Sequence, residues 1–167
     1  MDEDVFDDLF FGHAARLVRL ARLLGDDDPE DVVQEAFCKV YAVRGRLHAD
    51  PARVVAYLNR VVVNEVRSRH RHRAVVRRDA HLFVHDEAQA TSDPTDAHDR
   101  RSAVLDAMDG LPSRQREAVV LRFWLDLPLA AIAEAMGVRV GTVKSQLSRG
   151  LDTLGAVLAP DPSEVDR

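Results

Sequence analysis

Residues 59–73, NRVVVNEVRSRHRHR, contain the side chains of this sequence whose types most directly suggest recognition chemistry. Arginine guanidinium groups bind anions such as phosphates, and Asn64 is a neutral amide that offers one acceptor and two donors. The valines 61–63 precede Asn64, so this amide stands where an apolar helix face gives way to a basic one. The stretch therefore favours contact with a polyanion.

A second stretch, residues 127–151 (LPLAAIAEAMGVRVGTVKSQLSRGL), has the layout of a helix-turn-helix. Ala133 is small enough for a close helix crossing, Gly137 suits the turn, and Val138 fills the space between the helices. Val143 and Leu147, spaced i and i+4, face inward. In this motif the outward residues of the second helix reach the DNA major groove. A helical hairpin with a solvated polar face is the alternative.

Histidines suggest a third chemistry, metal binding. His81 and His85 in HLFVH have i, i+4 spacing, and His70, His72 and Asp86 are further candidates. No third ligand follows at a familiar zinc spacing, so we expect solvated histidines and no metal. The sequence also lacks a nucleophile triad and a phosphate-binding glycine loop. We therefore expect no enzyme activity and no cofactor.

The elements that position these motifs are predicted to be helices. Apolar residues at spacings of three and four predict a first helix over about 5–24, ended by Gly25. Asp28 and Pro29 mark the start of a second helix, whose buried face includes Cys38 and Tyr41. A third helix is expected over 51–78, and short helices from 101 to about 158.

We therefore expect an all-α fold of two small helical domains. The predicted boundaries are 1–78 for the first domain, 79–100 for a flexible acidic linker, 101–158 for the second domain and 159–167 for a tail. The linker assignment rests on a composition rich in Asp, Ala, Ser, Thr and Pro without sustained periodicity.

Charge is strongly segregated along the chain, although the formal net charge is only −5. Residues 53–78 carry eight arginines and one glutamate, a net charge of +7, and residues 112–155 carry +2. Residues 1–52 and 79–111 carry −6 each. Two basic segments separated by an acidic one indicate a polyanionic partner.

Several protein classes are excluded by the totals. No apolar run approaches the roughly 20 residues of a membrane helix, and the acidic start MDEDVFDDLF is not a signal peptide. A single cysteine, Cys38, permits no internal disulfide, and we expect it to be a small buried hydrophobe. A cytoplasmic protein is the expectation.

The motifs of this sequence resemble those of a known family. Residues 111–154, from LPSRQREAVVLRFW to SRGLDTL, resemble the promoter-binding C-terminal region of sigma-70 family RNA polymerase sigma factors. DPEDVVQEAFCKVY resembles the segment of that family that binds the polymerase clamp, and YLNRVVVNEVRSRHRHR its −10-element and DNA-melting helix. The two-domain build is similar to the extracytoplasmic-function subgroup, and in particular to actinobacterial members.

The resemblance implies partners for the first domain. Asp31, Gln34 and Glu35 match clamp-binding positions, and the helical period independently places them on the outer face of the second helix. Asn64, with the loop at about 47–52, is implied to capture a base flipped from the non-template strand. Tyr57 stands where tryptophan is common, and we expect it in the core, with base stacking as the alternative. The implied phosphate contacts are Arg60, Arg67, Arg69, Arg71 and Arg73.

The resemblance also implies contacts to the −35 element. This sequence departs from the family pattern at three places: Ser148 is smaller than usual, Ala131 replaces a common glutamate, and Pro128 stands where a Ser or Thr cap is usual. We expect Asp126 to cap the helix instead. The implied −35 contacts are Thr142, Lys144, Ser145, Ser148 and Arg149, with Gln146 as a further candidate.

The function implied is that of an alternative sigma factor. It would bind core RNA polymerase, direct it to selected promoters and help to melt the −10 region, and an anti-sigma factor is an expected partner. The alternative is a helix-turn-helix regulator without a sigma role, which explains residues 112–158 but neither EDVVQEAF nor the arginine helix.

Overall fold

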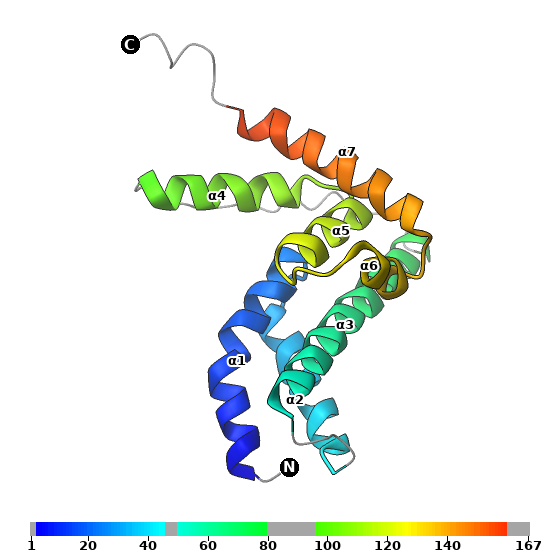
Figure 1. Ribbon diagram of the computed structural model, residues 1–167. Helices are drawn as coiled ribbons and strands as arrows, with labels where there is room; N and C mark the ends of the chain where they lie inside the picture. Colours follow the sequence, from blue (N-terminus) through cyan, green and yellow to red (C-terminus); the bar gives the residue numbers. More distant parts are fainter. Residues whose placement is uncertain (1–2, 46–49, 80–95, 160–167) are drawn as a thin grey trace. The chain divides into compact units, whose positions relative to one another are not determined.

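The computed structural model describes residues 3–45, 50–79 and 96–159, and the regular structure in these ranges is α-helical throughout (Figure 1). This confirms the predicted all-α class. Contacts within the chain divide it into two units, Met1–Val84 and His85–Arg167. The helices are α1 (Glu3–Leu23), α2 (Pro29–Val43), α3 (Pro51–Asp79), α4 (Asp96–Asp109), α5 (Ser113–Phe123), α6 (Leu129–Met136) and α7 (Val140–Leu158).

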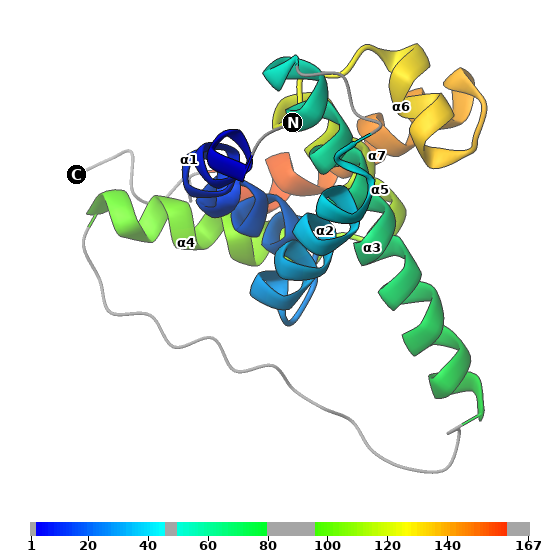
Figure 2. The ribbon, with the colours of Figure 1, turned by 90° about the horizontal axis from the view of Figure 1, so that it is seen from below.

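The first unit consists of α1, α2 and α3, which pack against one another pairwise. Each helix contributes apolar residues spaced three or four apart, so each presents one continuous face to the shared core. The C-terminal turns of α3 extend past the other two helices (Figure 2). The largest fully buried side chains are Leu17, Leu20, Val32, Val40, Val54, Leu58 and Val62.

A short turn joins α1 to α2 and has the predicted chemistry. Gly25 has a φ of 84°, which an L side chain rarely adopts, and its N–H bonds to the Arg22 carbonyl at 2.9 Å. The Asp28 side chain caps α2 by accepting the Asp31 N–H at 3.2 Å. Pro29 occupies the first helical turn, where its missing N–H costs nothing.

The second unit is built from α4 to α7. Helix α7 packs against α4, α5 and α6, and the core is centred on Leu121, Ile132 and Val143. Gly137 ends α6 with a φ of 64°, and the Val138 N–H then bonds to the Ala133 carbonyl at 3.0 Å. The turn of the predicted helix-turn-helix is therefore formed by the expected glycine.

Two details of the second unit differ from expectation. Helix α4 begins at Asp96, inside the predicted linker. The sequence did not predict this start because the charged first turn has no apolar periodicity, although acidic residues do favour the start of a helix. The α6 cap is also different, since no side chain caps this helix. Asp126 instead has a φ of 51° and lies 3.5 Å from the Arg122 guanidinium, so the predicted Asp126 cap is wrong.

The rest of the predicted linker and nearly all of the tail lie outside the described residues. The same holds for His81, His85 and Asp86 and for residues 47–49 of the predicted base-pocket loop.

Candidate nucleic-acid and polymerase interfaces

Helix α3 carries its candidate DNA-binding residues on two opposite faces. At 100° per residue, Arg60, Asn64 and Arg71 fall in one row along the helix, and all three are exposed. Arg69 and Arg73 fall on the opposite face and are only partly exposed. The structure therefore separates the five predicted phosphate-binding arginines into an outer group and an inner pair. Arg67, at the edge of the outer row, is half-buried.

The inner pair contacts the α1–α2 turn. Arg73 lies 2.8 Å from Asp26 Oδ2 and 2.5 Å from Asp27 Oδ2, and Arg69 lies 3.7 Å from Asp26 Oδ1. His70, between them, has Nε2 at 2.9 Å from the Gly25 carbonyl oxygen. Arg69, His70 and Arg73 thus dock α3 onto the turn, and the expectation of a solvated His70 is wrong.

Arg69 also binds two of the predicted polymerase contacts. Its guanidinium hydrogen-bonds the Asp31 carboxylate and lies 3.2 Å from Glu35 Oε1. Burial lowers the pKa of Arg69, but the bonds to Asp31 and Glu35 raise it more, so the net pKa lies above its ordinary value. Both carboxylates are about half exposed, so another cation could still reach them.

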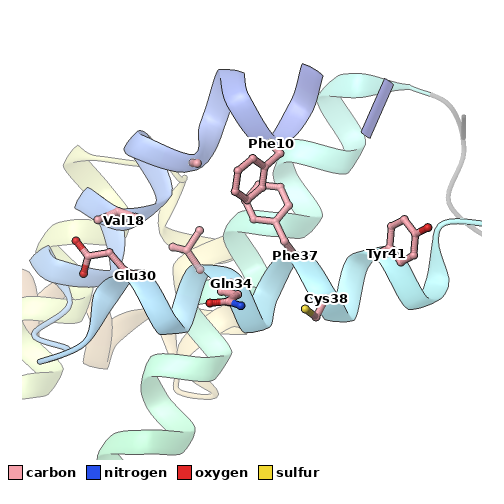
Figure 3. A pocket seen from close by; sticks show the side chains of 9 residues that line it. Phe10, Val18, Glu30, Gln34, Phe37, Cys38 and Tyr41 are labelled. Carbon is pink, nitrogen blue, oxygen red and sulfur yellow. The ribbon is translucent and has the colours of Figure 1, made fainter. Parts of the chain in front are cut away.

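Gln34, the third predicted polymerase contact, lies on another side of α2. It borders an apolar groove of about 660 Å³ between α1 and α2 (Figure 3). In this groove the rings of Phe10 and Phe37 meet edge to face, with centroids 4.7 Å apart. The groove is lined by Phe10, Ala14, Val18, Glu30, Val33, Gln34, Phe37, Cys38 and Tyr41.

Three residues predicted to be buried are more exposed than expected. Cys38 is exposed at the edge of the groove, because it follows Gln34 by one helical turn and shares its side of α2. Tyr41 is 38% exposed, and the Arg44 guanidinium stacks 3.7 Å from the centre of its ring. Tyr57 is also 38% exposed and lies in the outer row of α3, so its expected place in the core is wrong.

Glu65 links α3 to α2 through Lys39, whose ammonium group hydrogen-bonds Glu65 Oε2. This bond lowers the pKa of Glu65 below its ordinary value, and it outweighs the opposing effect of burial. The pair belongs to the same acidic and basic cluster, since Glu65 Oε1 also lies 3.9 Å from Arg69.

Helix α7 presents the predicted −35 residues at its N-terminal half. Val143 is fully buried, whereas Gln146 is half-buried, which leaves it less accessible than its neighbours. The Ser145 hydroxyl donates to the Gly141 carbonyl at 3.1 Å, within its own helix. The exposed predicted residues are Thr142, Lys144, Ser145, Ser148 and Arg149.

Several residues of these surfaces were not anticipated from the sequence. Asp26, Asp27 and Lys39 form ion pairs with α3, and the helical period alone could have placed Arg69 and Arg73 opposite Asn64. Asp152 lies on the outer side of α7, with its Oδ2 at 3.5 Å from the Ser148 hydroxyl. The i, i+4 spacing of Ser148 and Asp152 could have predicted this contact.

The described residues contain no group of three or more His, Cys, Asp or Glu side chains arranged to hold a metal ion. Within the same ranges, no helix has the length and apolar character needed to cross a membrane.

Known families and relatives match both units. Residues 9–75 match Sigma-70 region 2, and residues 101–154 match Sigma-70, region 4. The ECF RNA polymerase sigma factor SigE of Mycolicibacterium smegmatis is 35% identical over 95% of this chain, which spans 63% of that relative's length. SigM of Mycobacterium tuberculosis is 35% identical over 94% of this chain and 79% of its own length.

Two solved structures share the fold. The Bartonella quintana sigma factor RpoE, solved with the anti-sigma factor NepR, has a TM-score of 0.67 and 26% identity over 97% of this chain and 98% of its own. CnrH, solved with the cytosolic domain of CnrY, has a TM-score of 0.60 and 23% identity over 99% of this chain and 92% of its own. The resemblance drawn from the sequence is thereby confirmed. This chain belongs to the sigma-70 family of RNA polymerase sigma factors, as an extracytoplasmic-function (ECF) member of actinobacterial type.

Proposed function

We propose that this chain is an alternative sigma factor that binds core RNA polymerase, directs it to specific promoters and helps to open the −10 region. One observation carries the proposal: an exposed row of Arg60, Asn64 and Arg71 on α3 and a helix-turn-helix in the second unit lie, in this order, in the two regions that match the family. A regulator without a sigma role is not favoured, because its helix-turn-helix leaves the first unit unexplained.

Contact with the polymerase is assigned to exposed residues of α2 on two of its sides. Asp31 and Glu35 present carboxylates that are about half exposed, and Gln34 adds an amide beside the apolar groove. A basic polymerase surface would pair with the carboxylates, and such pairs mainly govern orientation and association rate. An anti-sigma factor is a further proposed partner. Of the two solved structures, RpoE is in complex with the anti-sigma factor NepR, and CnrH is in complex with the cytosolic domain of CnrY.

Promoter opening is assigned to the outer row of α3. Asn64 is exposed at the centre of the row, where its amide is free to meet the edge of an unstacked base. Arg60 and Arg71 flank it, one helical turn toward the N-terminus and two toward the C-terminus. Unstacking a base costs a few kcal/mol, so contacts of the displaced strand with such a row must compensate.

Recognition of the −35 element is assigned to α7, whose exposed N-terminal half would enter the major groove. Lys144 and Arg149 supply positive charge there, while Thr142 and Ser148 supply hydroxyl groups. As a sigma factor, the chain is proposed to act in the cytoplasm without catalysing a reaction, because the polymerase forms the RNA chain.

The proposal is tested by transcription in vitro. Core polymerase is incubated with a genomic promoter library, with and without the purified full-length chain, and the RNA 5′ ends are sequenced. A sigma factor yields new start sites that share two spaced upstream elements. A duplex-binding regulator would instead retain DNA without the core enzyme and start no transcripts, and that outcome would reject the proposal.

A further inference from the structure

Asp26 is an unusual residue for its position, because its side chain is fully buried although it lies in a short turn between two helices. A buried carboxylate is costly unless other groups pair with it. Arg73 binds its Oδ2 at 2.8 Å, Arg69 lies 3.7 Å from its Oδ1, and the Asp28 N–H donates to Oδ1 at 3.1 Å. Asp26 is therefore an anchor that two α3 arginines and one backbone group share.

Beyond Val66, the last buried apolar residue among the described residues of α3, the anchored residues determine how the helix is rotated about its axis. Arg69 and Arg73 are four residues apart and so share one helix face, and His70 adds a contact to the Gly25 carbonyl beside it. Arg71 lies about 200° around the helix from Arg69, since each residue advances about 100°. When Arg69 and Arg73 turn inward onto Asp26, Arg71 must turn outward, into line with Asn64 and Arg60.

We propose that Asp26 is a positioning residue for promoter opening. It holds Arg73 on the inner face of α3 and, together with Asp31 and Glu35, holds Arg69 there. Both arginines are thereby removed from the residues that neutralise DNA phosphates, and the outer row of Arg60, Asn64 and Arg71 is fixed toward the displaced strand. The inference rests on the proposed sigma function and deepens it, because it divides five chemically equivalent arginines by role.

The division has a measurable consequence. The outer row from Arg60 to Arg71 extends over about 16 Å, at 1.5 Å per residue. That length spans several phosphates of one strand, so both arginines have phosphates within reach. On a single strand, each phosphate neutralised adds about 0.7 to the slope of log K against log salt concentration. Arg71 should contribute to this slope, whereas Arg73 should not.

The experiment uses the complete chain assembled with core polymerase and a promoter fragment whose −10 region is pre-opened by mismatches. Binding is measured at several salt concentrations for the wild type and for Arg71→Gln, Arg73→Gln, Asp26→Asn and Asp27→Asn. Asp27→Asn is the matched control, since it removes the same charge from the same turn and contacts the same arginine, but its carboxylate is 85% exposed.

We expect Arg71→Gln to reduce the slope by about 0.7 and Arg73→Gln to leave it unchanged. Asp26→Asn should weaken binding to the pre-opened promoter about tenfold, because a row that is no longer held in place must be ordered on binding. Asp27→Asn should bind like the wild type, since exposed pairs contribute little. Circular dichroism and core binding show whether each variant is folded.

The inference is overturned if Arg73→Gln reduces the slope as much as Arg71→Gln, a result that does not depend on whether Asp26→Asn folds. It is also overturned if a folded Asp26→Asn variant binds like the wild type. In both cases the wild-type holoenzyme still binds the promoter, so the sigma function stands. A wild-type chain that fails to direct core polymerase rejects the proposed function and this inference together.

Discussion

Gly150 of α7 packs against Val119 of α5 so closely that a Cβ atom added to Gly150 would lie 3.1 Å from Val119 Cγ2. The same atom would lie 3.4 Å from Gln115 Cβ, so α5 has little room to yield. Gly150→Ala should therefore lower the free energy of unfolding of the second unit, because overpacking costs about 1–3 kcal/mol. Chemical denaturation followed by circular dichroism measures this change.

Gly155, in the same helix, is the matched control. A Cβ on Gly155 meets nothing within 4 Å, so Gly155→Ala should stabilise the unit by about 0.5–1 kcal/mol through helix propensity alone. Equal effects of the two substitutions would contradict the close packing of Gly150 on α5.

Stability of the first unit should depend on pH through Glu65. Its folded-state pKa lies below its ordinary value, so its contribution is fully present above the unfolded pKa of about 4.3 and is lost as pH falls through the folded pKa. Glu65→Gln should therefore lower the free energy of unfolding at pH 7 and have little effect at low pH. Urea denaturation across this range tests the sign. Glu30→Gln, which removes an exposed pair 3.9 Å from Arg22, is the control and should change the free energy of unfolding at pH 7 little.

Asn64→Ala should impair promoter opening while leaving core binding intact. Asn64 is exposed and lies away from the inner cluster of α3, so its loss removes a base contact without disturbing the helix packing. Permanganate footprinting of the −10 region measures opening, and a pull-down with core polymerase is the control. Asn64→Asp, which keeps the shape but loses both amide donors, should also be defective if the amide donates to the base. Normal opening by both variants would remove Asn64 from the site.

Lys144→Ala and Arg149→Ala should each weaken recognition of the −35 element. Loss of a base-edge contact is expected to cost about 1–3 kcal/mol and to relax the preference at that base, whereas loss of a phosphate contact lowers affinity for all sequences. Transcription from a set of −35 point mutants distinguishes the two roles. An unchanged promoter preference and affinity would exclude both residues from the interface.

Asp152→Asn should strengthen DNA binding by the second unit. Its carboxylate lies on the outer side of α7, 3.5 Å from Ser148, where it repels approaching phosphates. Removing an exposed charge changes the binding free energy by at most about 1 kcal/mol, so the gain should be a few-fold and should fade at high salt. Salt-dependent binding to a −35 fragment by the holoenzyme tests this. Weaker binding would show that Asp152 is a DNA contact itself.

The helices of both units could be predicted from local signals, because each signal acts within one turn. Gly25 and Gly137 adopt the left-handed conformation expected of them, and Asp28 caps α2 as its position suggests. The predicted Asp126 cap is wrong because this carboxylate, two positions before Pro128, can either cap α6 or pair with Arg122. The sequence alone does not decide between these two contacts.

The candidate sites were less predictable, because they depend on contacts between helices. All the arginines of residues 59–73 look alike as a string, yet Arg73 meets Asp26 across 47 residues of sequence. The helical period could have shown that Arg69 and Asn64 face apart. It could not have shown that Asp31 and Glu35 would be the carboxylates that meet Arg69.

The bonds from Arg69 to Asp31 and Glu35 also have a consequence for assembly. In the proposed polymerase contact at Asp31 and Glu35, Arg69 would be a tethered competitor, present at high effective concentration, for any cation that the polymerase brings to these carboxylates. The affinity measured for core enzyme is then the intrinsic affinity reduced by the cost of displacing Arg69. A chain in which Arg69 is neutral would bind such a partner more tightly, even though a residue outside the interface had been removed.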